Sequence, residues 1–213
     1  CLLPACSLNM QINKREFRTA GTKKLLIKQV FCSLVILFVV SIRCIATELS
    51  EIGLYVLPYP QQVSIGGDAF VFNNSLNIVL NKNHSEADSF AANELANDLK
   101  EQWNISAQVS TQKGDYSIIF IRKKGSSKFR KQSYQITIGK NEIFITANDE
   151  QGLFYGTRTL LQLIQKKGDD YQVPGLKIVD WPAILQRAVH YDTKHHQDKM
   201  SYVKSFIKEL ADY

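Results

Sequence analysis

The sequence G-L-F-Y-G-T-R-T-L-L-Q-L-I, residues Gly152–Ile164, sets the frame of the fold. Its apolar side chains recur at roughly helical spacing, which predicts an amphipathic helix with a buried face made by Leu160, Leu161, Leu163 and Ile164. Gly152 and Gly156 have no side chain, so they permit another backbone to come close to this helix. The pattern favours a well-packed structural helix, because the stretch by itself names no reaction.

The residues just before this helix predict how the chain enters it. Glu142–Ala147 alternates in the manner of a β-strand. Asn148, Asp149 and Glu150 follow, where an N-cap and an acidic first turn would satisfy free N–H groups and the helix dipole. The sequence thus predicts a strand, a tight turn and a helix. The Asp149-Glu150 pair is explained by this helix start and is not expected to be catalytic.

A second helix is predicted over residues 86–102. Ser85 is placed to act as its N-cap, with Asp88 three residues further on. One apolar stripe is expected to run along it, formed by Ala87, Phe90, Ala91, Leu95, Leu99 and Trp103. This helix and the one after Asp149 are the two helices of the predicted α+β domain.

The remaining elements of that domain are expected to be strands and turns. Strands are predicted over residues 61–65, 69–72, 76–80, 107–109, 116–122 and 134–138. Gly66-Gly67-Asp68 predicts a hairpin between the first two strands, and Gly139-Lys140-Asn141 a hairpin that leads into residues 142–147. Residues 123–131 and 166–170 are polar and predict solvated loops.

The positive charge of the chain belongs to its first part. The 213 residues carry a formal net charge of +6, and 45% of them are hydrophobic, which is enough for a packed core. Residues 1–46 hold seven basic and one acidic side chain, which leaves 19 of each sign in the remainder. A domain with balanced charge lacks the electrostatic footprint of a nucleic-acid-binding protein, so no nucleic acid is expected as a partner.

Residues 1–46 are arranged like an export signal. Lys23, Lys24 and Lys28 precede the apolar run 29–42, and Cys44-Ile45-Ala46 offers small residues for cleavage. We expect an exported protein, in the periplasm, the extracellular space or a lysosome-like compartment. An uncleaved anchor through residues 29–42 remains the alternative, although the run is shorter than the roughly 20 residues of a membrane span. All four cysteines lie in this segment, so the remainder of the chain forms no disulfide.

A second structural unit is predicted after Asp180-Trp181-Pro182. Arg187–Tyr191 predicts a strand, and residues 200–213 predict an amphipathic helix. One strand and one helix cannot bury their faces alone, so residues 183–213 are expected to be the incomplete start of a larger α/β unit. The fold class is therefore α/β: an α+β domain over residues 52–180, with helices packed on a sheet, and the beginning of a second unit.

The order of several short motifs resembles the glycoside hydrolase family 20 β-N-acetylhexosaminidases. The resemblance rests on Leu57-Pro58-Tyr59-Pro60-Gln61, Gly152-Leu153-Phe154-Tyr155-Gly156, Thr159-Leu160, Gln162-Leu163, Val173-Pro174, Asp180-Trp181-Pro182, Arg187, His190-Tyr191-Asp192 and Leu210-Ala211-Asp212-Tyr213. It implies that residues 52–180 are the small domain of that family. Residues 183–213 would then be the truncated start of its (β/α)8 catalytic barrel.

The resemblance also implies an activity and a binding residue. Family members remove terminal N-acetylhexosamine from glycans by substrate-assisted, retaining hydrolysis that needs no cofactor. Their catalytic Asp-Glu pair lies on a later barrel strand, so it is expected beyond Tyr213 and this chain alone is expected to be inactive. Arg187 matches the arginine that binds hydroxyls of the terminal sugar, with His190 and Asp192 as its neighbours. A surface or inter-domain salt bridge is the alternative role for Arg187.

Other readings stay open at this stage. His190, His195 and His196 suggest a metal site, but adjacent histidines point in different directions and no metal is expected. A family 84 hexosaminidase or an α-glucuronidase would share the small domain. A non-catalytic carbohydrate-associated or scaffolding module would consist of residues 52–180 alone. The choice between N-acetylglucosamine and N-acetylgalactosamine, and the oligomeric state, do not follow from the sequence.

Overall fold

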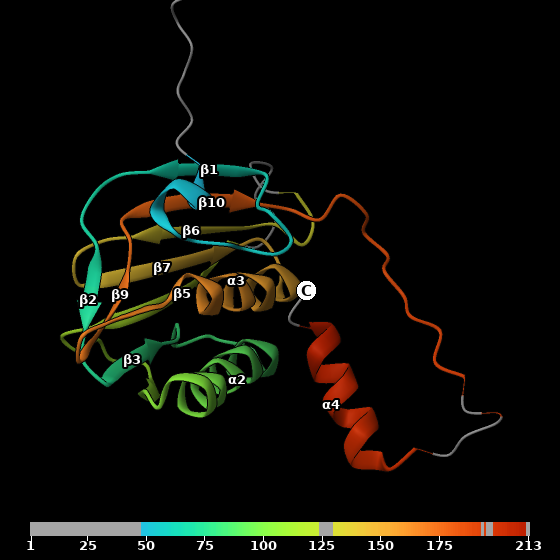
Figure 1. The fold of residues 1–213 in the computed structure, drawn as a ribbon. Helices are drawn as coiled ribbons and strands as arrows, with labels where there is room; N and C mark the ends of the chain where they lie inside the picture. The colour runs from blue at the N-terminus through green and yellow to red at the C-terminus, as the bar shows by residue number, and fades with distance from the viewer. Residues whose placement is uncertain (1–47, 124–129, 193, 195–197, 212–213) are drawn as a thin grey trace, which may run out of the picture. The chain divides into compact units, whose positions relative to one another are not determined.

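A seven-stranded mixed sheet forms the centre of the protein in a computed structural model that describes residues 48–123, 130–192, 194 and 198–211 (Figure 1). The strands lie in the order β1-β10-β6-β7-β5-β3-β4. Their bounds are Gln62–Ile65 for β1, Ser75–Val79 for β3, Ser106–Ser110 for β4, Ser117–Arg122 for β5, Tyr134–Ile138 for β6, Glu142–Ala147 for β7 and Leu176–Asp180 for β10. The 3-10 helix η1, Leu49–Ile52, precedes them.

A smaller sheet has the strand order β2-β9-β8, with bounds Phe70–Phe72, Asp170–Val173 and Gln165–Lys167. Its aromatic side chains Phe70, Phe72 and Tyr171 belong to the main core, and the ring centroid of Phe70 lies 5.9 Å from that of Tyr116. Phe70 and Phe72 are fully buried. The small sheet thus closes one edge of the apolar interior.

Helices α2 (Glu86–Trp103) and α3 (Glu150–Leu163) lie side by side on one face of the large sheet (Figure 1). Both begin as predicted. Ser85 and Asp88 form a reciprocal capping box, and the Asp149 side chain accepts a hydrogen bond from the Gly152 N–H at 2.9 Å. The apolar face predicted for α3 is buried against the strands at all four positions, Leu160, Leu161, Leu163 and Ile164.

The predicted close approach at the two glycines is confirmed. A Cβ atom added to Gly152 would lie 2.3 Å from the Ser133 carbonyl oxygen, and one added to Gly156 would lie 2.6 Å from Cγ2 of Ile145. Only glycine leaves room for these contacts, so α3 can lie directly against β6 and β7. The hairpin predicted around Gly139-Lys140-Asn141 also forms, with β6 antiparallel to β7.

Several predictions for the first domain were wrong. Gly66-Gly67-Asp68 does not form a hairpin: β1 pairs with β10, whereas β2 pairs with β9 in the other sheet. Residues 166–170 do not form a plain loop, because β8 and β9 pair across a turn at Gly168, which has φ 66°. The Phe90 side chain, expected in the buried stripe of α2, is 59% exposed. The partners of β1 and β2 are distant in the sequence, so the local pattern around Gly66-Gly67-Asp68 does not contain them.

The second unit is only partly as predicted. The helix forms as α4, Met200–Ala211, but Arg187–Tyr191 is not a strand. A strand needs a neighbouring strand for its hydrogen bonds, and the described residues place none beside this segment. Residues 1–46, His195 and His196, most of the basic loop 123–131 and the last two residues lie outside the described part of the chain. Within the described ranges, no helix has the length and apolar character to cross a membrane.

Candidate functional site

Arg187 lies in the extended segment that follows β10, and its side chain is exposed. The centre of its guanidinium group is 5.0 Å from the centroid of the Tyr155 ring on α3. Among the described residues, no carboxylate lies within ion-pair distance of Arg187. The salt bridge considered as an alternative role is therefore not seen in this part of the chain. Stacking on an aromatic ring holds the guanidinium and leaves its N–H donors free to bind another group.

A cavity of about 350 Å³ adjoins Arg187. Its lining includes the aromatic residues Tyr59, Tyr155 and Trp181, together with Gln162 and Arg187. Aromatic faces beside a few polar groups are the usual composition of a small-molecule site. His190 and Asp192 do not line this cavity, so the structure does not bring them together with Arg187 there.

The hydroxyl groups of Tyr134 and Thr159, two residues that line the cavity, are hydrogen-bonded to each other. The Tyr134 hydroxyl lies 2.6 Å from the hydroxyl of Thr159 and donates to Asp180 Oδ2 at 2.8 Å. Burial, and then the negative charge of Asp180, raise the pKa of Tyr134 well above its ordinary value. The other carboxylate oxygen of Asp180 accepts from the Gln61 N–H at 3.0 Å. This cluster joins β6, α3, β10 and the entry to β1, and so fixes the place where the segment carrying Arg187 leaves the sheet.

Gln162 and Leu57 line another part of the cavity and are hydrogen-bonded to each other. The Gln162 amide group accepts from the Leu57 N–H at 2.8 Å and donates to the Leu57 carbonyl oxygen at 3.0 Å. These two bonds hold the proline-rich lead-in, residues 57–60, against α3. The lead-in and the segment after β10 are far apart in sequence, and α3 positions both.

His190 and Asp192 are exposed. The Asp192 carboxylate accepts a hydrogen bond from the Lys194 N–H at 2.8 Å, which is a local turn contact. Between them, the Tyr191 hydroxyl donates to Asp198, and this bond raises the pKa of Tyr191 to about 12. No group of three or more histidine, cysteine, aspartate or glutamate side chains in the described ranges is arranged to hold a metal ion.

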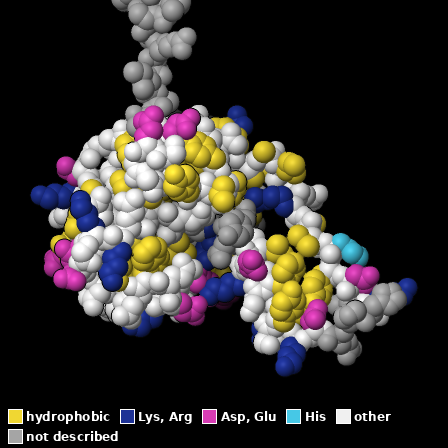
Figure 2. All heavy atoms as spheres, viewed as in Figure 1, with side chains coloured by type: hydrophobic (Ala, Val, Ile, Leu, Met, Phe, Trp, Pro, Cys, Tyr) yellow, Lys and Arg dark blue, Asp and Glu magenta, His cyan; other side chains and the backbone are white. Residues whose placement is uncertain are grey.

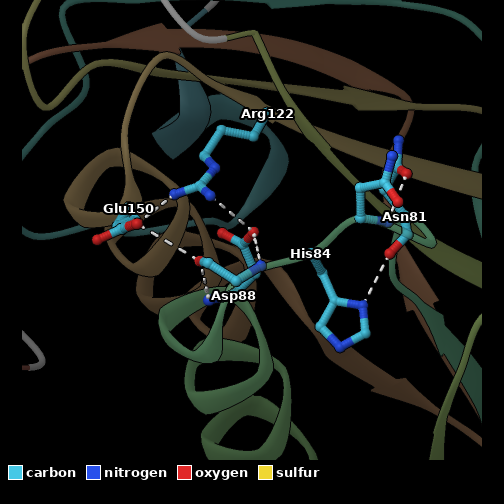
Figure 3. A network of polar contacts seen from close by, with 7 residues as sticks. Asn81, His84, Asp88, Arg122 and Glu150 are labelled. Atoms are coloured by element: carbon cyan, nitrogen blue, oxygen red, sulfur yellow. Dashed lines mark hydrogen bonds and ion pairs between the residues drawn. The ribbon is translucent and has the colours of Figure 1, made fainter.

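The Asp149-Glu150 pair serves structural contacts, as predicted. Asp149 caps α3 and also accepts from the Gln132 N–H at 2.6 Å. Figure 3 shows Glu150 directed at Arg122, 2.5 Å away, while the other side of the same guanidinium faces Asp88 at 3.2 Å. These contacts tie the starts of α2 and α3 to the end of β5. Both acids therefore have structural partners at the start of α3.

A buried ion pair between α2 and α3 was missed by the sequence analysis. Asp98 has no exposed surface, and its Oδ2 lies 2.5 Å from Nη1 of Arg158, which is itself 6% exposed. The signal was present, because Asp98 stands next to Leu99 in the apolar stripe of α2 and Arg158 interrupts the apolar run of α3. A charge at a buried helical position implies a partner at another one.

Comparison with known proteins gives the family. The model of domain 2 of glycosyl hydrolase family 20 matches residues 53–181. A β-hexosaminidase from Porphyromonas gingivalis is 24% identical over 89% of this chain and 25% of its own length. A β-hexosaminidase from Vibrio furnissii is 31% identical over 38% of this chain and 13% of its own. The chain thus spans a quarter or less of the length of these curated relatives.

Solved structures share the fold. The family 20 exo-β-N-acetylglucosaminidase from Vibrio harveyi, in complex with N-acetylglucosamine, superposes with a TM-score of 0.65 at 22% identity, over 74% of this chain and 24% of that one. The family 20 β-N-acetylhexosaminidase from Streptomyces coelicolor superposes with a TM-score of 0.63 at 24% identity, over 74% and 32% of the two chains. The family model covers more than half of the chain, and the fold agrees with it, so the chain belongs to glycosyl hydrolase family 20.

Proposed function

We propose that these residues are part of an exported β-N-acetylhexosaminidase, which removes terminal N-acetylhexosamine from glycans. The observation that carries this proposal is the family 20 domain at residues 53–181. Relatives described as β-hexosaminidases support it, as does the N-acetylglucosamine bound to the Vibrio harveyi enzyme. The reaction would be substrate-assisted and retaining: the 2-acetamido oxygen attacks the anomeric carbon while an acid protonates the leaving oxygen.

The described part of the chain would support this chemistry without performing it. Four of its acids, Asp88, Asp98, Asp149 and Glu150, are engaged in contacts at α2 and α3. The proton donor and the aspartate that orients the acetamido group would therefore come from the region beyond Tyr213. The small domain would hold the first residues of the catalytic unit in place.

Arg187 would bind the terminal sugar. A guanidinium presents several N–H donors in one plane, which suits two adjacent hydroxyl groups of a pyranose ring. Two observations support the role: the group has no carboxylate partner among the described residues, and the Tyr155 ring holds it from one side. His190 and Asp192 would act only if the complete catalytic unit brings them closer to the sugar than the present arrangement does.

Residues 1–46 would direct the protein out of the cytoplasm, either as a cleaved signal or as an anchor through residues 29–42. No cofactor is required by the proposed reaction, since the acetamido group of the substrate supplies the nucleophile.

The proposal is tested with the protein encoded by the complete reading frame that contains these residues. It should release an aryl alcohol from aryl N-acetyl-β-hexosaminides and should not act on the matching β-glucoside. Equal turnover of the two substrates would argue for a different glycosidase mechanism. A complete protein without turnover of either one would support the non-catalytic module instead.

A further inference from the structure

We propose that Asp98 is a docking site for α4: a carboxylate buried between α2 and α3 that holds the second unit of the chain through Lys208. This inference concerns how the two units are joined and does not depend on the proposed activity. It rests on the contacts of Asp98, on the charges around it, and on the way in which α4 is attached.

The docking site is formed by α2 and α3 themselves. Asp98 belongs to α2 and is fully buried, and its Oδ2 accepts from Arg158 Nη1 of α3 at 2.5 Å. The Arg158 guanidinium lies 4.9 Å from the centroid of the Phe154 ring, one helical turn before it. Two helices of the small domain thus fix the position of the carboxylate whether or not α4 is present.

The second oxygen of this carboxylate faces α4. Asp98 Oδ1 is 2.8 Å from Lys208 Nζ, and this ion pair is its one polar contact among the described residues. Lys208 also lies 3.0 Å from Glu101, one turn further along α2. The negative charges of Asp98 and Glu101 are matched by two positive charges, those of Arg158 and Lys208, only when Lys208 is docked. The hydrogen bond to Asp98, and then the one to Glu101, raise the pKa of Lys208, as expected for a lysine whose charged form is favoured by its partners.

Apolar burial of α4 is only partial, since Val203, Phe206 and Ala211 are its half-buried residues. None of the residues of α4 is buried, and Met200, Tyr202, Ile207 and Leu210 are each between 42% and 68% exposed. Figure 2 shows hydrophobic side chains gathered on the face of α4 that is turned toward the viewer. The described residues between β10 and α4 form no helix or strand. The charged contact with Asp98 and Glu101 is the specific attachment.

A helix of 12 residues is not stable by itself in water. Loss of the docking contact should therefore unfold α4 locally, and amide hydrogen exchange of residues 200–211 reports whether it is docked. The variants to compare in the 213-residue chain are Lys208→Met, Asp98→Asn and their combination. Lys204→Met is the matched control, because Lys204 is an exposed lysine one turn earlier on α4 with no ion pair among the described residues.

Lys208→Met should speed exchange of the α4 amides by about 10-fold or more, as expected for loss of a charged hydrogen bond to a buried acid, and leave α2 and α3 unchanged. The double variant should exchange no faster in α4 than Asp98→Asn alone, because both remove the same contact. Lys208→Arg should keep most of the protection, and Lys204→Met should change nothing. The inference is overturned if Lys208→Met leaves exchange of α4 unchanged, or if Lys204→Met has the same effect. Because Lys208 is on the surface, this test stands even if Asp98→Asn destabilises the whole domain.

Discussion

The Tyr134 hydroxyl donates a hydrogen bond to Asp180 Oδ2 over 2.8 Å, and this bond joins the first residue of β6 to the last residue of β10. Both residues stand where the sheet ends and the segment carrying Arg187 begins. The Asp180 carboxylate also accepts a hydrogen bond from the Gln61 N–H. This one side chain therefore links β10 to β6 and to the residue before β1. The position of the candidate sugar-binding arginine therefore depends on a contact inside the small domain.

Tyr134→Phe should lower the free energy of unfolding by about 1–3 kcal/mol, because it leaves Asp180 and Thr159 with one partner fewer in a buried place. Chemical denaturation of the 213-residue chain measures the change. Tyr116→Phe is the control, since its ring packs on Phe70 but its hydroxyl has no hydrogen bond recorded among the described residues. An equal decrease in the free energy of unfolding for the two variants would show that the hydrogen bonds of the Tyr134 hydroxyl do not stabilise the domain.

The raised pKa of Tyr134 also predicts that the free energy of unfolding falls at alkaline pH. Burial raises its pKa in the folded protein above the unfolded value of about 10. The folded state then holds the proton more tightly, so this contribution is fully present below about pH 10 and is lost as the pH rises further. The wild-type protein should lose up to about 1.4 kcal/mol more per pH unit above 10 than Tyr134→Phe does. Unfolding curves at pH 9 and pH 11 test this, and parallel losses in both proteins would contradict it.

The glycines of α3 give a prediction about packing. Gly152→Ala and Gly156→Ala should each destabilise the domain by about 1–3 kcal/mol, because the added methyl group enters occupied space. Gly152→Ala should be the more harmful, since its neighbour is a backbone carbonyl that cannot turn away. Gln151→Ala, at an exposed position of the same helix, is the control. Melting temperatures of the three variants provide the comparison, and a harmless Gly152→Ala would mean that α3 lies further from β6 than the structure shows.

Local sequence was sufficient for the parts of the fold that local contacts determine. Ser85 and Asp149 were identified as helix caps because a cap and its N–H partner lie within three residues. The β6–β7 hairpin was identified for the same reason. The partners of β1 and β2 lie about a hundred residues or more away, in β10 and β9, and the turn signal at Gly66-Gly67 carries no information about them.

The candidate site was predictable only in part. Arg187 was found because a family resemblance marks it, and neither composition nor periodicity would have done so. Its stacking on Tyr155 could not be predicted, since the two residues come from different units of the chain. The Asp98–Arg158 pair was visible as two charges at buried helical positions, but which charge meets which depends on how α2 and α3 pack. The strand expected at Arg187–Tyr191 depends on strands that the described residues do not include.

The role proposed for Arg187 predicts what its loss would do in the complete protein. Loss of a charged hydrogen bond to the sugar costs about 1.5–3 kcal/mol, so Arg187→Ala should lower kcat/KM by about 10- to 150-fold. Arg187→Lys should recover only a small part, because a lysine keeps the charge but not the planar set of donors. Both proteins should melt like the wild type, since the side chain is exposed. A normal kcat/KM for Arg187→Ala, in a protein with an unchanged melting curve, would remove Arg187 from the site.

The most direct measurement is the anomeric configuration of the first product released by the complete protein, followed by proton NMR with an aryl N-acetyl-β-glucosaminide. The 213-residue chain, assayed beside it, is the control for activity that does not come from the catalytic unit. We predict a β-configured sugar as the first product, no reaction of the matching substrate with a 2-hydroxyl group, and no turnover by the 213 residues alone. An α-configured first product, or comparable turnover of the 2-hydroxyl substrate, would contradict substrate-assisted hydrolysis by this protein.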